Sequence, residues 1–347
     1  MKYKTVAYKG SKRKLLTDIE AIANDIGART IFDGFSGTGI VSAHLRHKGF
    51  QVDANDISES AYIFGSVFLQ GYNEDKVKSL VSEMNNLKPV QGWLTENYSG
   101  TQKRVIRGTG GEIQERPLGY TPQNAMKIDA AREYIEGLSI QEEDRRALIF
   151  SVILGADSVF NNSNDQKSSL KDWQTKSLRE VVFQAPTLVT GFDGIQYRGN
   201  ILEANVGSYD MVYLDPPYTH GVLYDSCYHL NDSIATWEKP DLDYDYALPR
   251  PKSICYRKNG EKAGMFYNKS TAVDCFTEMS QKFDCKRLVL SYSDAPRNTL
   301  TIEELFDIFS KRGKCYIRTK DHKICTQPKA MNKISTNLKE YFIIIDS

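Results

Sequence analysis

The sequence predicts a doubly wound α/β fold with a mostly parallel sheet and a mainly helical inserted region. At 30–41 (TIFDGFSGTGIV) a short apolar run leads into a glycine-rich turn and then into a helix-like run. At 50–57 a second apolar run ends in an acid, and at 212–218 (VYLDPPY) a third ends in two prolines, which cannot continue a hydrogen-bonded ladder. Strands that alternate with helices in this way form parallel sheets covered on both faces.

The bulk composition excludes several classes of protein. Lys and Arg number 45 and Asp and Glu 44, so the net charge of +1 gives no global field for nucleic acid, and such binding must come from local patches. The 6 cysteines lack Cys-x-x-Cys spacing, which argues against a zinc site or disulfide scaffold and fits a reducing cytoplasm. No segment approaches the ~18 apolar residues of a membrane span. We therefore expect a soluble, cytoplasmic protein of one large domain with an inserted lobe and no metal.

The segment 212–218 carries the candidate catalytic residues. Its prolines force the chain out of the sheet with Asp215 at the carboxyl edge, where open α/β sheets bind ligands. The Asp215 carboxylate and the Pro216 carbonyl can each accept one N–H, and Tyr218 can stack on a flat ring. A ring with an exocyclic amine fits this set, although an ordinary strand-to-turn exit uses the same residue types. The predicted catalytic residues are Asp215, Pro216, Pro217 and Tyr218.

The glycine turn indicates a nucleoside ligand. Gly37 and Gly39 permit a tight turn and a close approach of the backbone to a ligand at the start of a helix. Asp56 follows Gly39 by 17 residues, near the ~20 expected for an acid that binds ribose hydroxyls. The pattern is not the Gly-x-Gly-x-x-Gly of dinucleotide sites, so S-adenosylmethionine is a better candidate than NAD.

Four motifs in a fixed order resemble one family. They are YKGSKRKLL at 8–16, FSGTG at 35–39, ND at 55–56 and DPPY at 215–218. Together they resemble the Dam-like alpha group of DNA adenine-N(6) methyltransferases, with the closest likeness to FokI-type restriction-modification methylases. In related groups the catalytic motif precedes the glycine turn, so the order itself distinguishes this one. The likeness covers most of the chain.

The resemblance implies which residues hold S-adenosylmethionine. The first segment and the glycine turn bind it, the acid holds its ribose, and a polar residue ahead of the catalytic strand contacts its adenine. For the first segment a solvated helix start is the alternative, and for Asn200 a turn-forming Gly-Asn pair. The implied cofactor-binding residues are Tyr8, Lys12, Asp33, Phe35, Ser36, Gly37, Thr38, Gly39, Asp56, Ile57, Asn200, Ile201 and Asp215.

The resemblance also divides the chain. Residues 1–75 and 196–347 form the expected catalytic domain, and 76–195 the inserted helical and loop region for target recognition. Helical spacing is expected at 61–68, 77–87, 124–135 and 145–156, and a long glycine-rich basic loop at 98–123. A second basic stretch at 318–333 is expected as a loop beside the active-site edge. Either loop is a DNA-contacting segment or a solvated surface loop.

Basic residues in these segments are the candidate contacts to DNA phosphates. They are Lys103, Arg104, Arg107, Arg116, Lys171, Lys239, Arg257, Lys258, Lys320 and Lys323.

The expected reaction moves a methyl group from S-adenosylmethionine to the exocyclic amine of adenine in duplex DNA. An adenine inside the stack cannot reach the donor, so the base must be flipped out. The donor is already activated, so alignment and electrostatics suffice without a metal or a covalent nucleophile. Double-stranded DNA is the expected partner, with a separately acting cognate restriction endonuclease as a candidate. RNA adenine, a cytosine amine, or a non-catalytic specificity subunit are the alternatives.

Overall fold

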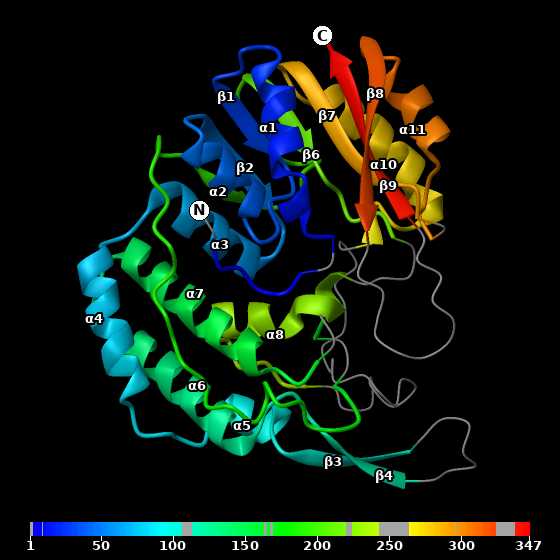
Figure 1. Cartoon of the computed structure of the whole chain (residues 1–347). Coiled ribbons are helices and arrows are strands. Elements are labelled where there is room, and N and C mark those ends of the chain that lie inside the picture. The colour runs from blue at the N-terminus through cyan, green and yellow to red at the C-terminus, as the bar shows by residue number, and fades with distance from the viewer. Residues whose placement is uncertain are drawn as a thin grey trace. The chain divides into compact units, whose positions relative to one another are not determined.

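A computed structural model gives the fold of residues 3–8, 10–105, 113–162, 165–166, 169–219, 224–242, 264–295, 297–323 and 337–347. The chain forms two compact units, each built from several stretches of sequence (Figure 1). Unit 1 comprises Met1–Ser11, Ser58–Val189 and Asp225–Gly260, and unit 2 comprises Lys12–Ile57, Thr190–Tyr224 and Glu261–Ser347.

Unit 2 contains the main sheet, which among the described residues has seven strands in the order β5-β2-β1-β6-β7-β9-β8. β5, β2, β1, β6 and β7 run parallel, whereas β9 and β8 are antiparallel to their neighbours. The order reverses at β1, which lies between β2 and β6, and open sheets bind ligands at the carboxyl end of such a switch point. The strands are β1 (Thr30–Asp33), β2 (Gln51–Asp56), β5 (Gln196–Arg198), β6 (Tyr209–Leu214), β7 (Cys285–Ser293), β8 (Lys314–Lys323) and β9 (Asn337–Asp346).

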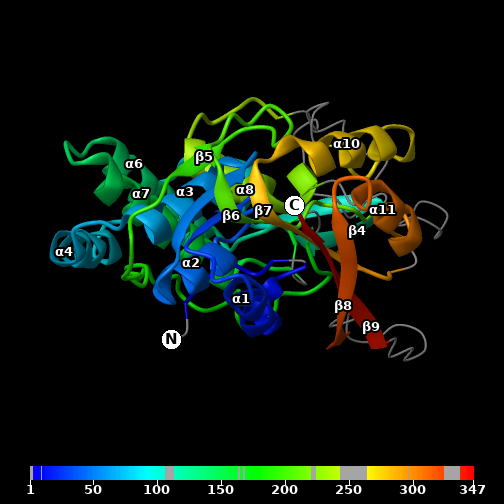
Figure 2. The same ribbon diagram turned by 90° about the horizontal axis from the view of Figure 1, so that it is seen from above.

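Helices cover both faces of this sheet. Figure 2 shows α1 and α2 on one face and α10 and α11 on the other. On the second face, Phe276 and Leu305 belong to the same buried cluster as Leu214 and Leu290 of the sheet. The predicted doubly wound, mostly parallel α/β fold is therefore confirmed. The helices are α1 (Leu16–Asn24), α2 (Ile40–His47), α10 (Lys269–Lys282) and α11 (Ile302–Phe309), and the 3-10 turn η1 (Lys12–Lys14) precedes α1.

The strands β9 and β8 complete the sheet, and β8 includes part of the basic stretch 318–333. In β9, residues 342–345 are at most 2% exposed, because β7 and β8 flank the strand and both faces are covered. The basic stretch expected as a loop begins inside β8, which contains Arg318, Lys320 and Lys323. That part of the prediction was wrong, since an edge strand with solvated positions tolerates a run of polar residues. The rest of the stretch lies outside the described residues.

Unit 1 is mainly helical, as predicted for the inserted region. Phe64 and Phe68 of α3 pack on Phe150 of α7, with ring centroids 4.5 Å and 5.3 Å apart. Tilted and edge-to-face aromatic pairs of this kind bury large apolar areas and fix the two helices against each other. The helices are α3 (Glu59–Gln70), α4 (Glu74–Asn85), α5 (Trp93–Tyr98), α6 (Pro122–Glu136), α7 (Glu142–Val159) and α8 (Tyr224–Thr236).

The glycine-rich segment 98–123 contains a hairpin where a long loop was expected. β3 (Thr101–Val105) and β4 (Ile113–Pro117) pair antiparallel, from Thr101 opposite Pro117 to Val105 opposite Ile113. Three of the segment's glycines, Gly108, Gly110 and Gly111, fall in 106–112, outside the described residues. The composition of the whole segment therefore hid two short strands of polar and β-branched residues on either side.

The compact units follow other boundaries than the predicted domains. Residues 58–75 belong to unit 1 because α3 packs on α7, and α8 belongs there as well. The assignment of target recognition to 76–195 stays a prediction. None of the helices in the described ranges combines the length and apolarity needed to cross a membrane.

Candidate active site

Asp215 is the first residue after β6, at the carboxyl edge of the parallel strands. β6 lies between β1 and β7, with Tyr213 opposite Asp33 and Leu214 opposite Leu290. The side chain of Asp215 is 19% exposed, and Pro216, which follows it, is buried. The strand exit thus lies at the edge where open sheets bind ligands, as its sequence predicted.

Asp215 shares a buried cation with a second carboxylate. The ammonium of Lys12 in η1 lies 2.8 Å from Asp215 Oδ1 and 3.3 Å from Glu340 Oε1 of β9. Lys12 is 6% exposed and Glu340 3%. Three parts of the sequence therefore meet in one charge cluster, whose two carboxylates and one ammonium leave one net negative charge. Sequence reasoning placed Lys12 and Asp215 in the site but missed Glu340.

The cluster determines the protonation of Asp215 and Lys12. Burial raises the pKa of Asp215 to about 6, Lys12 opposes this increase, and Glu340 adds to it. Burial alone would lower the pKa of Lys12, but the negative charge of Asp215 above all holds that pKa well above its ordinary value. At neutral pH Asp215 is therefore mostly ionised, the form in which both of its oxygens only accept hydrogen bonds, and Lys12 is protonated.

The ring of Tyr218 is held in place from behind. Its centroid lies 4.0 Å from that of Tyr292 at an interplanar angle of 37°. The Tyr218 carbonyl accepts hydrogen bonds from both the amide and the hydroxyl of Thr299, each at 3.0 Å. Tyr292 donates to the Leu300 carbonyl at 3.0 Å, which fixes the supporting ring as well. Tyr218 therefore offers an ordered aromatic surface before any base binds.

The glycine turn is docked onto the end of β2. Gly37 and Gly39 have φ values of 51° and 71°, in the left-handed region where glycine is relaxed and other residues are strained. The amide of Gly37 donates to Asp56 Oδ2 at 2.8 Å, and the amide of Ser36 donates to the Asn55 carbonyl at 2.9 Å. Gly39 is the N-cap of α2, so the turn delivers the start of that helix to the carboxyl edge. The predicted residues Phe35, Ser36 and Thr38 belong to this turn.

Asp33 is a buried carboxyl with an unused acceptor. It is 1% exposed, and its Oδ2 accepts a hydrogen bond from the Ser42 hydroxyl at 2.6 Å. Its Oδ1 has no hydrogen-bond partner among the described residues. Burial raises the pKa of Asp33 to about 7, against the effect of Ser42 and with a further increase from Asp215 and Asp56. An oxygen of this kind suits a ligand that brings a positive charge or an N–H.

The other predicted cofactor residues differ in their surroundings. Ile57 follows Asp56 and is 44% exposed, an apolar side chain open at the ligand-binding edge. Ile201 is 2% exposed and belongs to the buried cluster of unit 2. The Asn200 oxygen accepts the Leu202 amide at 3.2 Å, which is the turn geometry that its alternative interpretation expected.

Two further residues, neither of them among the predicted cofactor-binding residues, tie the cofactor segments together. The Asn55 side-chain amide donates to the carbonyls of Gly34 at 3.4 Å and Gly199 at 3.2 Å, joining the glycine turn to the end of β5. Gln196 donates to the Ser36 hydroxyl at 3.2 Å, and its own oxygen is buried without a partner in the described part of the chain. A buried amide that bridges two loops fixes their separation.

Tyr8 belongs to unit 1, whereas the other predicted catalytic and cofactor-binding residues belong to unit 2. Within unit 1 its ring stacks on Tyr228 of α8, with centroids 4.4 Å apart and planes 9° from parallel. The segment 8–16 is therefore divided between the two units, and its interpretation as one clamp formed by Tyr8 and Lys12 stays a prediction.

The candidate DNA contacts fall into three groups. Lys103 and Lys171 are exposed, and Arg116 is half-buried on β4. Lys239 pairs with Glu133, and Lys320 pairs with Asp18 at 3.1 Å. Outside the described residues or side chains lie Arg104, Arg107, Arg257, Lys258 and Lys323.

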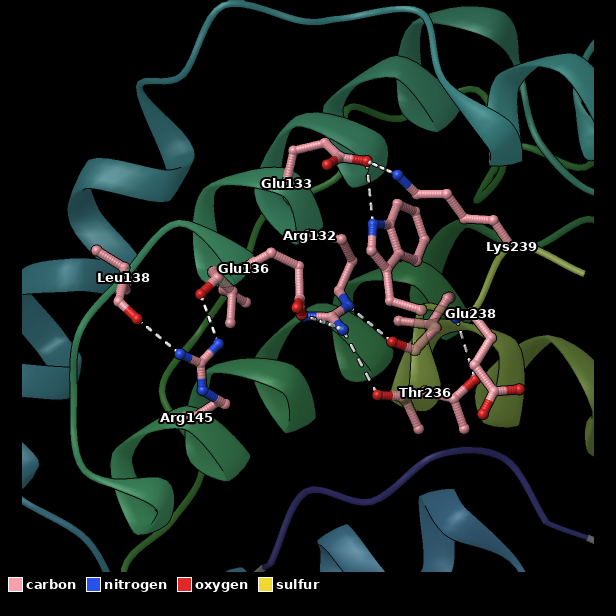
Figure 3. A network of polar contacts seen from close by, with 12 residues as sticks. Arg132, Glu133, Glu136, Leu138, Arg145, Thr236, Glu238 and Lys239 are labelled. Atoms are coloured by element: carbon pink, nitrogen blue, oxygen red, sulfur yellow. Dashed lines mark hydrogen bonds and ion pairs between the residues drawn. The ribbon is translucent and has the colours of Figure 1, made fainter.

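The pairing of Lys239 is part of a network in unit 1 (Figure 3). Arg132 of α6 donates to the Ile234 carbonyl at 2.7 Å and lies 5.3 Å from the Trp237 ring centroid. Glu133, the next residue of α6, accepts hydrogen bonds from the Trp237 indole and from Lys239. Trp237 and Lys239 have φ values of 54° and 52°, a strained backbone for residues with side chains. Strain of this kind persists only where the surrounding contacts hold it.

The comparisons identify the family. The sequence matches the D12 class N6 adenine-specific DNA methyltransferases over residues 8–292. It is 27% identical to the type II methyltransferase M.NlaIII of Neisseria lactamica over 88% of each chain. It is 25% identical to the type II methyltransferase M.CviAII of Paramecium bursaria Chlorella virus 1 over 98% of each chain. A third relative, M2.HphI of Haemophilus parahaemolyticus, is 26% identical over 90% of this chain and 89% of its own.

The matched region contains Lys12, the glycine turn, Asp56 and Asp215, and so includes all four motifs that carried the predicted resemblance. The chain belongs to the D12 class of N6 adenine-specific DNA methyltransferases.

Proposed function

We propose that the carboxyl edge of the unit 2 sheet is where this methyltransferase aligns the N6 amine of adenine with its methyl donor. The observation that carries this proposal is Asp215, a mostly buried carboxylate at the exit of β6 whose pKa of about 6 leaves it ionised at neutral pH. Family membership gives the reaction, which is methylation of adenine in DNA. Membership of an adenine-specific DNA methyltransferase family argues against RNA adenine and against a cytosine amine as the substrate.

S-adenosylmethionine is the methyl donor of this family, and when bound it supplies a methyl group on a positively charged sulfur. The residues of unit 2 fit such a ligand. The unpaired oxygen of Asp33 can accept from an ammonium, Asp56 can accept from ribose hydroxyls, and the exposed Ile57 can cover an apolar ring face. The turn at Gly37 and Gly39 lets the backbone approach closely.

Asp215 and Pro216 orient the amine. The carboxylate and the Pro216 carbonyl each accept one N–H of N6, which turns the nitrogen lone pair toward the methyl carbon. The net negative charge shared by Asp215, Glu340 and Lys12 stabilises the positive charge that moves from sulfur to nitrogen during transfer. Tyr218 stacks on the flipped base and returns ~1–3 kcal/mol of the few kcal/mol lost on unstacking.

We further propose that unit 1 recognises the target sequence, and that exposed basic residues there contact DNA phosphates. Lys103 on the hairpin and Lys171 support this, since both are exposed. Lys239 of unit 1 is a weaker candidate, as is Lys320 of unit 2, because each already pairs with a carboxylate. As the named relatives are type II methyltransferases, we propose that the chain is the modification enzyme of a restriction-modification system, beside a separate endonuclease of the same specificity.

The test is transfer of labelled methyl from S-adenosylmethionine to genomic DNA that lacks adenine methylation, followed by mapping of each modified base. We expect methyl-adenine at one short repeated sequence, which would also identify the recognition site. The same assay with Asp215→Asn removes the charge and keeps the shape of the side chain. Full activity of this variant would refute the proposed site while leaving the family unaffected.

A further inference from the structure

Glu340 occupies a place that an acid rarely occupies. It is 3% exposed, in a strand whose residues 342–345 are almost completely buried. Its Oε1 accepts the Ser291 hydroxyl at 2.5 Å and lies 3.3 Å from the Lys12 ammonium. Burial of a carboxylate is costly unless it is paired and hydrogen-bonded, and both conditions are met here.

The direction of β9 explains how Glu340 reaches the site. β9 runs antiparallel to β7, and Glu340 lies opposite Ser293, the last residue of β7. The amino-terminal part of β9 therefore lies at the carboxyl edge of the parallel strands, where Asp215 leaves β6. A carboxylate from the far end of the sequence is thus delivered to the same cation as the catalytic one.

The net charge of the cluster depends on Glu340. Lys12 paired with Asp215 alone would be a neutral ion pair, and a carboxylate neutralised by an ammonium at 2.8 Å is a poor acceptor for an amine. Glu340 draws on the same ammonium and restores one net negative charge to the cluster. A site that has to stabilise a cationic transition state needs that charge.

We propose that Glu340 is a positioning residue for methyl transfer, which holds Lys12 between two carboxylates and so keeps Asp215 a strong acceptor for the adenine amine. The proposal rests on the proposed role of Asp215. Glu340 acts through Lys12 and Asp215 and is not itself in contact with the base.

The proposal makes a prediction about pH. Asp215 is faced by Lys12 of η1, Glu340 of β9 and Asp33 of β1, and by Tyr213 and Tyr218 of its own segment. Of these, Glu340 raises the pKa of Asp215 and Lys12 lowers it. Removal of the Glu340 charge therefore lowers the pKa of Asp215, both directly and because Lys12 then pairs with Asp215 alone.

The experiment compares the wild type with Glu340→Gln, which keeps an acceptor for Ser291 and removes the charge. The rate constant kcat is measured from about pH 5 to about pH 9 on a DNA substrate. We expect the acidic limb to move to lower pH, and the plateau kcat to fall several-fold with a smaller change in KM for DNA. The control is Glu303→Gln in α11, the same change of charge at an exposed position of unit 2.

A second measurement needs neither cofactor nor activity. The carboxyl carbon of Asp215 is followed by NMR titration of protein labelled at its aspartates, and Asp215→Asn identifies the signal. The titration midpoint should be lower in Glu340→Gln than in the wild type, and should stay near the wild-type value in Glu340→Asp, which retains the charge. Thermal melting confirms that each variant is folded.

The outcomes separate this inference from the function on which it rests. If Asp215→Asn is inactive but Glu340→Gln has the pH profile and Asp215 midpoint of Glu303→Gln, Glu340 has only a structural role and the inference is wrong. If Asp215→Asn is as active as the wild type, the proposed role of Asp215 fails first. A lowered midpoint together with a displaced acidic limb supports both.

Discussion

Asp215 accepts hydrogen bonds at its full strength only while it is ionised, and its pKa of about 6 keeps it mostly so at neutral pH. Asp215→Asn removes the charge, so we expect methyl transfer to fall by about 10²-fold or more, as for the loss of one group that stabilises transition-state charge. Binding of S-adenosylmethionine should be nearly unchanged, because Asp33, Asp56 and the glycine turn remain. Single-turnover methylation and equilibrium dialysis of the labelled cofactor measure the two quantities. A comparable loss of cofactor binding would show that Asp215 acts mainly in holding the cofactor, the other role that the resemblance implies for it.

Asp33 gives the stability of the protein a pH dependence. Its pKa in the folded state is about 7, above the ordinary 3.8, so its favourable contribution is fully present below about pH 4 and is lost as the pH rises through 7. In Asp33→Asn the side chain stays neutral. We therefore expect the free energy of unfolding of the variant, minus that of the wild type, to increase by roughly 2–4 kcal/mol as the pH is raised from about 5 to about 9.

Urea unfolding of both proteins without ligand, at several pH values, checks this expectation. A difference in unfolding free energy that does not change with pH would show that Asp33 has an ordinary pKa. S-adenosylmethionine should reduce the difference, because a cationic group beside the unpaired Asp33 oxygen stabilises the ionised form.

At the scale of elements, the glycine turn depends on its left-handed backbone. Gly37→Ala places a Cβ at a φ of 51°, so we expect about 1 kcal/mol or more of strain and weaker binding of S-adenosylmethionine. Gly207→Ala is the matched control in unit 2, since an added Cβ there meets nothing within 4 Å. Calorimetric titration of both variants with the cofactor gives the comparison. Equal affinities would show that the turn does not contact the ligand.

The β3–β4 hairpin has a corresponding test for DNA. If Lys103 contacts a phosphate, Lys103→Ala should lower the slope of log affinity against log salt by ~0.9. Lys88→Ala removes an equally exposed charge from unit 1 and serves as the control. Fluorescence anisotropy with duplex DNA at several salt concentrations measures the slopes. The same slope for Lys103→Ala and the wild type would make Lys103 a solvated side chain.

Helices and strands whose apolar residues recur at a regular spacing were predictable from the sequence. Strands that form only because they pair with a neighbouring strand were not. The apolar run of β1 ends at a glycine turn and that of β6 at two prolines, which predicted the fold and placed Asp215 at a sheet edge. The hairpin was hidden because Gly108, Gly110 and Gly111 dominate the composition around two short polar strands. β8 was underestimated because an edge strand can be polar throughout.

The site shows the same division. Motif order gave Lys12, the glycine turn, the pair Asn55 and Asp56, and Asp215. The contacts of Glu340 and Gln196, and the bridging role of Asn55, are not encoded by sequence spacing. A signal for Glu340 existed, as a lone acid at the start of an apolar run. It was overlooked because only the carboxyl ends of strands were considered, and the amino end of an antiparallel strand lies at the same edge.

At the scale of the whole molecule, each compact unit is assembled from three separated stretches of sequence. Boundaries drawn along the chain therefore could not reproduce them, since α3 follows β2 directly yet packs on α7 in the other unit. The predicted insert was right in its helical character, and the tertiary contacts that decide membership are long-range.

The position of β9 in the sequence also determines when, during translation, the charge cluster can assemble. Lys12 is synthesised long before Glu340, so one of its two carboxylate partners is missing until translation has passed that residue. β7 likewise lacks one of its two neighbouring strands until β9 has been made. A nascent chain that already carries every recognisable motif would thus still lack an assembled centre until β9 has been made and has paired with β7.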